Sequence, residues 1–132
     1  MNIVIDTSAV MAVVVNEPTK EALTAATVGM KLIAPSSLPW EMGNAFSAML
    51  KRKRITAEQA HAGLRAYRTL PIRLVEVDLD QAIDVAAEFG LYAYDAYFMT
   101  VARREVCELL TLDRGLVHAA KQAGIPVKEV VP

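Results

Sequence analysis

The 132-residue sequence has few of the features that mark secreted, membrane or modular proteins. Cys107 is its single cysteine, so an internal disulfide is excluded and there are too few cysteines for a cysteine-based zinc site. The longest strongly apolar run, Ala9 to Val15, is far shorter than the roughly 20 residues needed to cross a bilayer. The N-terminus has no basic leader and Asp6 interrupts its apolar stretch, so we expect no signal peptide. A cytoplasmic protein without a membrane partner is the simplest expectation.

Repeats, low-complexity tracts and Gly/Ser-rich linkers are also missing from the sequence. Its length falls within the usual size of one domain, so we expect a single domain over residues 1–132. Hydrophobic residues make up 54% of the chain, which is enough to form a core and too many for a disordered protein.

Short apolar runs alternate along the chain with segments of helical period. The first run, Asn2 to Ile5, lacks a period of two, as expected of a strand buried on both faces. A segment near the C-terminus begins with proline and is expected to be an edge strand, where a missing N–H costs little. The strands are expected at residues 2–5, 31–34, 73–77 and 108–112, with the edge strand at 126–131.

Between these runs, apolar side chains recur at the spacing of one helix face. Such a stripe extends from Leu38 to Leu50, and Thr56 is expected to cap a helix that runs to about Leu70. Two further helices are expected at about residues 94–102 and from Asp113 to Gly124.

One more helix is expected between Asp80 as its N-cap and Gly90 as its C-terminal stop. Strands that alternate with helices imply an α/β fold, which we expect to be a three-layer α/β/α sandwich with a mainly parallel sheet of about four to five strands. In such sheets, ligands bind beyond the carboxyl ends of the strands. In the helix between Asp80 and Gly90, the residues expected to face inward are Leu79, Ala82, Ile83, Ala86 and Ala87.

Four acidic residues are expected near that rim of the sheet. Asp6 and Asp113 each follow a predicted strand, Glu41 lies in the first turns of a predicted helix, and Asp95 lies near the start of another. Carboxylates that converge repel one another, so they either protonate or bind a cation. Mg²⁺ or Mn²⁺ is the natural partner for oxygen ligands, and such a site can promote hydrolysis at phosphorus.

Each acid also has a purely structural explanation. Asp6 and Asp113 can cap helices, and Glu41 is favourable near a helix N-terminus. Asp95 is hardest to explain in this way, because it lies in a segment that is apolar nearly all round. We therefore expect its carboxylate to be buried and in need of a partner that no adjacent Lys or Arg supplies.

Other cation-binding α/β proteins also place an aspartate after the first strand. Haloacid-dehalogenase-type phosphatases need a second aspartate two residues later, where this chain has Ser8. Response-regulator receivers need an acidic pair near the first strand end and a lysine after a late strand, and neither is evident. Both families are set aside.

The order of the four acids and their contexts resembles the PIN-domain nucleases, and among them most closely the VapC-type toxins of toxin–antitoxin pairs. The resemblance extends over essentially the whole chain, and its strength lies in four motifs in the correct order. These motifs are Ile3-Val4-Ile5-Asp6-Thr7-Ser8, Pro35 to Asn44 with Glu41 three residues before the asparagine, Tyr94-Asp95-Ala96-Tyr97 and Leu110-Thr111-Leu112-Asp113.

The resemblance implies a function for each motif residue. Asp6, Glu41, Asp95 and Asp113 match the acidic quartet that binds one or two divalent ions and carries catalysis. Some relatives have a further acid shortly after the fourth member of the quartet, whereas this chain has Arg114 and its neighbours there. This difference puts a second metal ion in doubt. The residues that match positions contacting the acids or the substrate are Ser8, Asn44 and Thr111.

Charge is unevenly distributed along the chain. Residues 51–73 contain seven basic residues and one acidic residue, a net charge of +6, whereas residues 1–50 carry −2 and residues 74–132 carry −5. Phosphate contacts by such a segment would supply affinity without reading sequence. A solvated run near a helix C-terminus is the alternative, and Arg103 and Arg104 are weaker candidates. The candidate RNA-binding residues are Lys51, Arg52, Lys53, Arg54, Arg65 and Arg68.

The two histidines, His61 and His118, lie on predicted helices and are expected to have structural or solvated roles. The resemblance implies a homodimer that binds a small antitoxin across an apolar groove. Core packing explains the candidate groove residues equally well. They are Met30, Trp40, Met42, Phe46 and Met49.

The expected function is therefore that of a Mg²⁺-dependent endoribonuclease, with Mn²⁺ able to substitute, which acts as the toxin of a toxin–antitoxin pair. RNA rather than DNA follows from the resemblance. The alternative is a PIN-like module that binds nucleic acid or protein with little or no catalytic activity.

Overall fold

A four-stranded sheet forms the centre of the computed structural model, which describes residues 1–130. All strand pairs are parallel and the order is β3-β2-β1-β4. The sheet is therefore parallel, as expected, and the carboxyl ends of its strands share one rim. The strands are β1 (Asn2–Ile5), β2 (Lys31–Pro35), β3 (Ile72–Val75) and β4 (Glu108–Leu110).

Two strands end earlier than the apolar runs predict. β3 ends at Val75 and β4 at Leu110, each two residues before the expected end. Beyond β4 the backbone bonds to hydroxyls instead of to a neighbouring strand: the Leu112 N–H donates to Ser8 Oγ at 2.9 Å, and the Asp113 N–H donates to Thr111 Oγ1 at 3.0 Å.

The edge strand expected at residues 126–131 is reduced to a single bridge in the part that the structure describes. Leu109 pairs in parallel with Val127, the Leu109 N–H donates to the Pro126 carbonyl, and the Lys128 N–H donates to the Leu109 carbonyl. Val131 lies outside the described residues.

Seven helices are found in the described chain, and two of them lie between β1 and β2. The second of these, at residues 20–26, has no counterpart among the sequence expectations. Its seven residues present Leu23 as the buried side chain, which is too short an apolar pattern to recognise. The helices are α1 (Thr7–Val14), α2 (Lys20–Ala26), α3 (Leu38–Lys51), α4 (Ala57–Thr69), α5 (Leu79–Phe89), α6 (Ala93–Glu105) and α7 (Arg114–Gln122).

The face that α5 buries differs from the expected one. Its N-cap is Asp78, whose side chain accepts from the Gln81 N–H, while Asp80 lies in the first turn. Leu79 and Ile83 are 62% and 60% exposed, and Ala87 is also exposed. The helix has two apolar stripes, and packing against α6 selects the other one. The side chains that this stripe turns inward are Ala82, Val85, Ala86 and Phe89.

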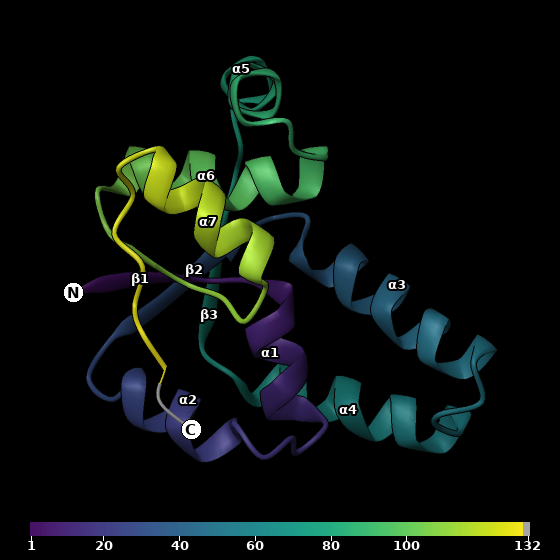
Figure 1. Ribbon diagram of the computed structural model, residues 1–132. Coiled ribbons are helices and arrows are strands. Elements are labelled where there is room, and N and C mark those ends of the chain that lie inside the picture. The colour runs from purple at the N-terminus through teal and green to yellow at the C-terminus, as the bar shows by residue number, and fades with distance from the viewer. Residues whose placement is uncertain (131–132) are drawn as a thin grey trace.

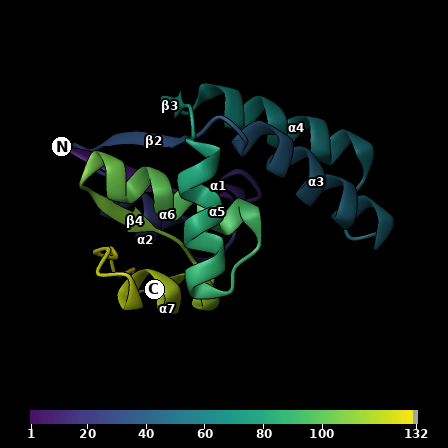
Figure 2. The ribbon, with the colours of Figure 1, turned by 90° about the horizontal axis from the view of Figure 1, so that it is seen from above.

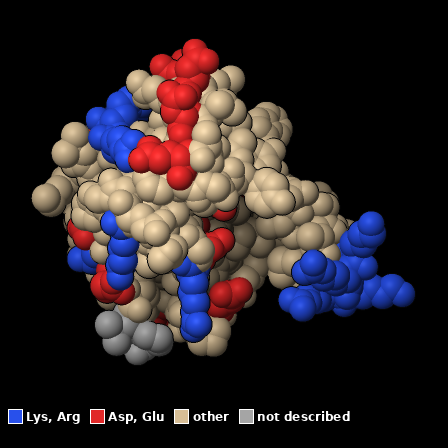
Figure 3. Space-filling model, turned by 45° about the horizontal axis from the view of Figure 1, so that its top comes forward, with Lys and Arg blue, Asp and Glu red and all other residues tan. Residues whose placement is uncertain are grey.

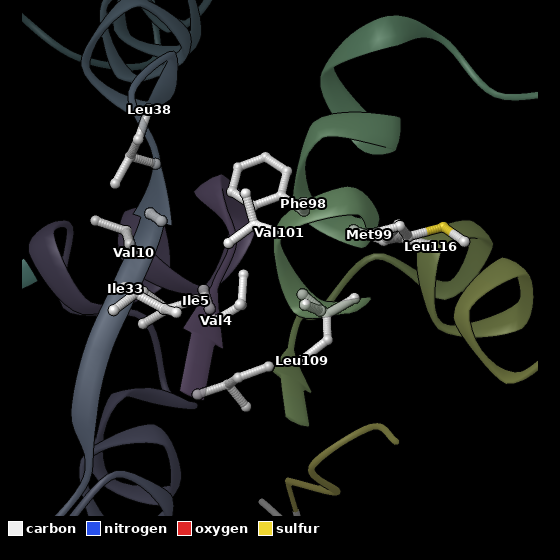
Figure 4. Packing of buried hydrophobic residues seen from close by; sticks show 14 of the residues in the cluster. Val4, Ile5, Val10, Ile33, Leu38, Phe98, Met99, Val101, Leu109 and Leu116 are labelled. Atoms are coloured by element: carbon white, nitrogen blue, oxygen red, sulfur yellow. The ribbon is translucent and has the colours of Figure 1, made fainter. Parts of the chain in front are cut away.

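Helices cover both faces of the sheet, which gives the expected three layers. Figure 1 shows α5, α6 and α7 on one side and α1 and α2 on the other. α6 packs against β1, β2 and β4, and the side chains of Phe98 and Val101 lie toward Val4 on the sheet (Figure 4). The pair α3 and α4 extends away from the sheet as an arm, which Figure 2 shows from above. Within residues 1–130, every helix is too short or too polar to cross a bilayer.

Candidate metal centre

The carboxyl ends of the strands bring the predicted acids to one rim of the sheet. Asp6 directly follows β1, and Asp113 follows β4 by three residues. Glu41 lies in the first turn of α3, and Asp95 lies in the first turn of α6. These four residues are called the acidic quartet below.

Asp6 is the most deeply buried member of the quartet, with 4% of its surface exposed. Its Oδ1 accepts from Ser8 Oγ at 2.7 Å and from the Ala9 N–H at 3.0 Å, and its Oδ2 accepts from Thr111 Oγ1 at 2.5 Å. The bond from Ala9 makes Asp6 the N-cap of α1, so its capping role and any functional role coexist. Burial raises the pKa of Asp6 to about 6, although these three bonds act in the opposite direction.

Glu41 is half-buried and is held by two hydroxyls that the sequence did not single out. Thr7 Oγ1 donates to its Oε1 at 3.1 Å, and Ser37 Oγ donates to its Oε2 at 2.9 Å. Burial is the main reason that its pKa is raised to about 7, with the charges of Asp6 and Asp95 adding to the effect. Ser37 precedes Glu41 by one helical turn, and that spacing is the signal that could have identified it.

Asp95 is only half-buried, whereas its apolar sequence context predicts full burial. The reason is its position in the first turn of α6, where the flanking Tyr92 and Tyr94 are themselves exposed. Burial nevertheless raises the pKa of Asp95, and the charge of Asp113 adds to the rise. The fourth acid, Asp113, is exposed and caps α7 by accepting from the Leu116 N–H at 3.1 Å.

The quartet is connected by repulsion between its own charges and lacks a basic partner. Asp113 raises the pKa of both Asp6 and Asp95, and Asp6 and Asp95 raise that of Glu41. The ion pairs in residues 1–130 join Arg104 to Glu105 and Lys121 to Glu129, and neither involves the quartet. The four carboxylates are thus close enough to interact without a cationic side chain to compensate them.

The quartet does not form a closed metal cage as its side chains stand. In the described part of the chain, no three acidic, histidine or cysteine side chains are arranged to hold a metal ion without moving. The carboxylates of Asp6, Glu41 and Asp113 are instead turned toward the hydroxyl and N–H donors described above.

Of the three residues expected to assist the acids, two contact Asp6 directly. Ser8 and Thr111 donate to its two carboxylate oxygens and lie 3.4 Å from each other through their hydroxyl oxygens. Asn44 is exposed on α3, one turn after Glu41. Among residues 1–130, no hydrogen bond joins the Asn44 side chain to the quartet.

The basic residues lie at some distance from the quartet along the arm of α3 and α4. Lys51, Arg52, Lys53 and Arg54, called the basic tip below, are all exposed at the turn that joins the two helices. Figure 3 shows blue side chains gathered at the far end of the arm. The other basic residues of the arm, which are exposed on α4 together with His61, are Arg65 and Arg68.

The apolar residues expected to line a partner groove mostly belong to the core. Met42 and Phe46 are buried, and Met30 and Met49 are partly buried and pack against the core. Trp40 is 75% exposed. Of the five, Phe46 also lines a cavity of about 330 Å³ between α1, α3 and α4.

Comparison with known proteins identifies the fold family. The PIN domain family model matches residues 3–122. Among solved structures, PAE2754 of Pyrobaculum aerophilum has a TM-score of 0.70 and 24% identity over 90% of this chain and 87% of its own. The Sarcin-Ricin loop cleaving toxin VapC20 of Mycobacterium tuberculosis has a TM-score of 0.67 and 14% identity, over 98% and 99% of the two chains.

A third similar structure is VapBC2 of Rickettsia felis bound to a DNA fragment from its promoter, with a TM-score of 0.66 and 15% identity over 98% of each chain. Among curated protein sequences, none matches the chain. At these identities the solved structures establish the fold alone.

The buried Asp6 predicts an unusual dependence of stability on pH. Its folded pKa of about 6 lies above 3.8, the ordinary pKa of an aspartate in an unfolded chain, so the folded state binds the proton more tightly than the unfolded state. The resulting cost to stability is absent below pH 3.8, grows up to pH 6 and is complete above it, where it amounts to about 3 kcal/mol. In EDTA, Asp6→Asn should therefore raise the free energy of unfolding at pH 8 by about 2 to 3 kcal/mol.

Urea unfolding at pH 4 and pH 8 measures this effect. At pH 4 the variant and the parent should be nearly equal. The matched control is Asp84→Asn, which replaces an exposed acid in the middle of α5 and should follow the parent at both pH values. An Asp6→Asn variant with the same pH profile as the parent would contradict the assigned burial of this charge.

Proposed function

The chain belongs to the PIN-domain family, and on that basis we propose that it is a divalent-metal-dependent endoribonuclease that acts as the toxin of a toxin–antitoxin pair. The observation that carries the proposal is the acidic quartet at the carboxyl rim, coupled through its charges and lacking a basic partner in residues 1–130. Repelling carboxylates in a partly buried setting are stabilised by a cation.

The donor set fits a hard divalent ion. All four side chains offer carboxylate oxygens, which Mg²⁺ prefers, and Mn²⁺ should substitute for it. Asp6 would be the fixed ligand, because Ser8, Thr111 and the Ala9 N–H already hold its oxygens. Asp95, which is half-buried and accepts no hydrogen bond within residues 1–130, is free to turn toward an ion. Glu41 would turn by releasing one of its bonds from Thr7 and Ser37, and Asp113 would complete the set.

The bound ion would supply Lewis acidity for water and charge neutralisation for the phosphodiester. The protein's own contribution is to position the acids, beginning with Glu41, whose pKa of about 7 in the metal-free chain would fall once a cation neutralises the rim. Thr7 and Ser37 hold its two oxygens and thereby orient the carboxylate at the rim. Ser8 and Thr111 do the same for Asp6, and we propose that Asn44, which is exposed one turn after Glu41, contacts the substrate.

Substitution of the quartet tests the proposed activity. Asp6→Asn, Glu41→Gln and Asp95→Asn should each lower cleavage of single-stranded RNA in Mg²⁺ by about 100-fold or more, because each removes a ligand charge. Asp113→Asn keeps a competent helix cap, so a comparable loss there would separate ligand binding from capping. The readout is the cleavage rate, with a Mn²⁺-induced rise in the melting temperature as an independent measure.

The control for these variants is Asp84→Asn, an exposed acid on α5 that should cleave at the parental rate. EDTA should abolish cleavage by the parent, and Mn²⁺ should restore it. If the parent binds RNA or a protein but does not cleave RNA in the presence of either Mg²⁺ or Mn²⁺, the alternative function holds, that of a PIN-like binding module.

We also propose that the basic tip holds the RNA backbone. Its four side chains are exposed, and within residues 1–130 they form no ion pair, so their charges are available to phosphates. α4 is held close to α3, since a Cβ at Gly63 would lie 2.6 Å from the ring of Phe46. This packing fixes the tip relative to the rim, and Arg65 and Arg68 extend the positive surface along α4.

Neutralising the basic tip should weaken binding rather than catalysis. Replacing all four residues of the tip with Gln should raise KM for RNA, leave kcat near the parental value and reduce the salt dependence of binding by about 0.7 in log–log slope per lost phosphate contact. Lys20→Gln with Lys31→Gln is the matched control, since both are exposed outside the arm. An unchanged salt slope in the four-residue variant would show that the tip is only solvated.

The proposed toxin role requires an antitoxin and, from the family resemblance, a homodimer. Support for the antitoxin comes from VapBC2, a similar fold described together with its VapB partner. The cavity between α1, α3 and α4 offers an apolar surface for such a partner, with Val14, Phe46, Ile55 and Ala66 among its walls.

Expression of the chain alone should arrest growth of a bacterial host, because uncontrolled RNA cleavage stops translation. Co-expression of a short open reading frame next to its gene should restore growth. The Asp6→Asn variant, expressed at the same level, should be harmless. Normal growth at high levels of the parent protein would contradict the toxin role while leaving the nuclease assignment open to the cleavage assay.

A further inference from the structure

An open pocket with aromatic walls lies beside the acidic quartet. Its volume is about 340 Å³, within the usual range for small-ligand sites. It is formed where β2 and β3 end, so it opens on the same rim as the quartet. Its lining residues are Ser36, Ser37, Trp40, Glu76, Val77, Leu79 and Tyr97.

Three residues connect this pocket to the quartet. Ser37 lines the pocket and donates through Oγ to Glu41 Oε2 at 2.9 Å. Trp40 directly precedes Glu41 in the first turn of α3, and Tyr97 follows Asp95 by two residues on α6. A ligand in the pocket would therefore lie next to whatever occupies the quartet.

The pocket is also a fixed structure. Its floor is held by the Ser36 N–H, which donates to the Val75 carbonyl at 2.8 Å, and by Arg104 Nη1, which donates to the Glu76 carbonyl at 2.7 Å. The ring of Tyr97 packs edge-to-face against that of Tyr94, with 5.8 Å between the ring centroids. These contacts set the walls before any ligand arrives.

The chemistry of the walls favours a nucleobase over a phosphate. Trp40 is 75% exposed and lines the pocket together with Leu79, which is 62% exposed, so apolar surface is gathered at this place and does not occur as a single side chain. Indole and phenol rings stack on bases, and two serine hydroxyls offer hydrogen bonds to a base edge. Glu76 in the lining and the nearby Asp78 would repel a phosphate, and Arg104, which reaches the Glu76 carbonyl, is paired with Glu105. A neutral base meets no such repulsion.

We propose that this pocket binds one unpaired base of the RNA, the one adjacent to the phosphodiester held at the quartet, with Trp40 as its stacking platform. The proposal rests on the nuclease function proposed above and adds a base-binding subsite to it. The subsite restricts the substrate to single-stranded RNA, since a paired base cannot enter.

Trp40 is the only tryptophan of the chain, so its fluorescence reports directly on the pocket. The parent protein is titrated in Mg²⁺ with a short single-stranded RNA that has phosphorothioate linkages, which resist hydrolysis, and with a strand of equal length made of abasic sugars with the same linkages. The RNA should quench and shift the emission, and the abasic strand, which offers the same phosphates to the basic tip, should not. Equal quenching by both strands, or quenching by neither, would overturn the proposal.

Cleavage kinetics give a second, independent test. Trp40→Leu, which keeps an apolar side chain without a stacking face, should raise KM for single-stranded RNA by about 10-fold. Trp40→Tyr should recover most of this loss. Tyr92→Leu is the matched control, because Tyr92 is 89% exposed and lies outside the pocket. An unchanged KM for Trp40→Leu would overturn the proposal.

Sedimentation of the parent and of Trp40→Leu excludes a different use of the same surface. If the variant falls to a smaller species while RNA leaves the tryptophan emission unchanged, the pocket is a protein interface and the proposal is wrong. Failure of the nuclease function remains distinguishable, because the parent would then cut no RNA whatever the fluorescence titration shows.

Discussion

The carboxylate of Asp6 is removed from water at the point where three parts of the chain meet. It ends β1, caps α1 and accepts from Thr111, which follows β4. Burying a charge is costly, and the hydrogen bonds only partly offset that cost, since the pKa still rises to about 6. The arrangement around Asp6 therefore determines both how the rim is built and why it attracts a cation.

The same side chains that hold the rim together also prepare its chemistry. Ser8 donates to Asp6 and accepts from the Leu112 N–H, so it fixes an acid and a loop at once. The Thr111 hydroxyl likewise donates to Asp6 and accepts from the Asp113 N–H. Residues at a functional site commonly reduce stability, and the repulsion within the quartet is such a cost. Binding of a cation would relieve it, which couples the stability of the protein to its metal.

The position of the rim follows from the sequence because parallel α/β folds obey simple rules. β1 was placed at its observed ends, and Asp6 and Asp113 came directly from the rule that strand ends and helix caps meet at one edge. The buried stripe of α3 follows from its helical spacing at Leu38, Met42 and Phe46, whereas Leu50 at the end of the predicted stripe is exposed. In these cases a single local pattern determined the outcome.

The remaining errors arose where tertiary contacts chose between local alternatives. α5 has two apolar stripes, and only the packing against α6 decides that Val85 rather than Ile83 is buried. Asp95 was expected to be buried from its neighbours, but the first turn of a helix leaves it half-exposed. Thr7 and Ser37 were not identified, because their bonds to Glu41 depend on the position of α3 relative to α1.

The account depends on a divalent cation being bound by Asp6 and its acidic neighbours. Anomalous diffraction from crystals soaked in Mn²⁺ measures this directly. We expect a peak in contact with Asp6 and at least one of Glu41, Asp95 and Asp113, which disappears in the Asp6→Asn variant. The account would be contradicted by well-diffracting crystals that show no anomalous peak at this rim at millimolar Mn²⁺, or that show Mn²⁺ bound only at another place.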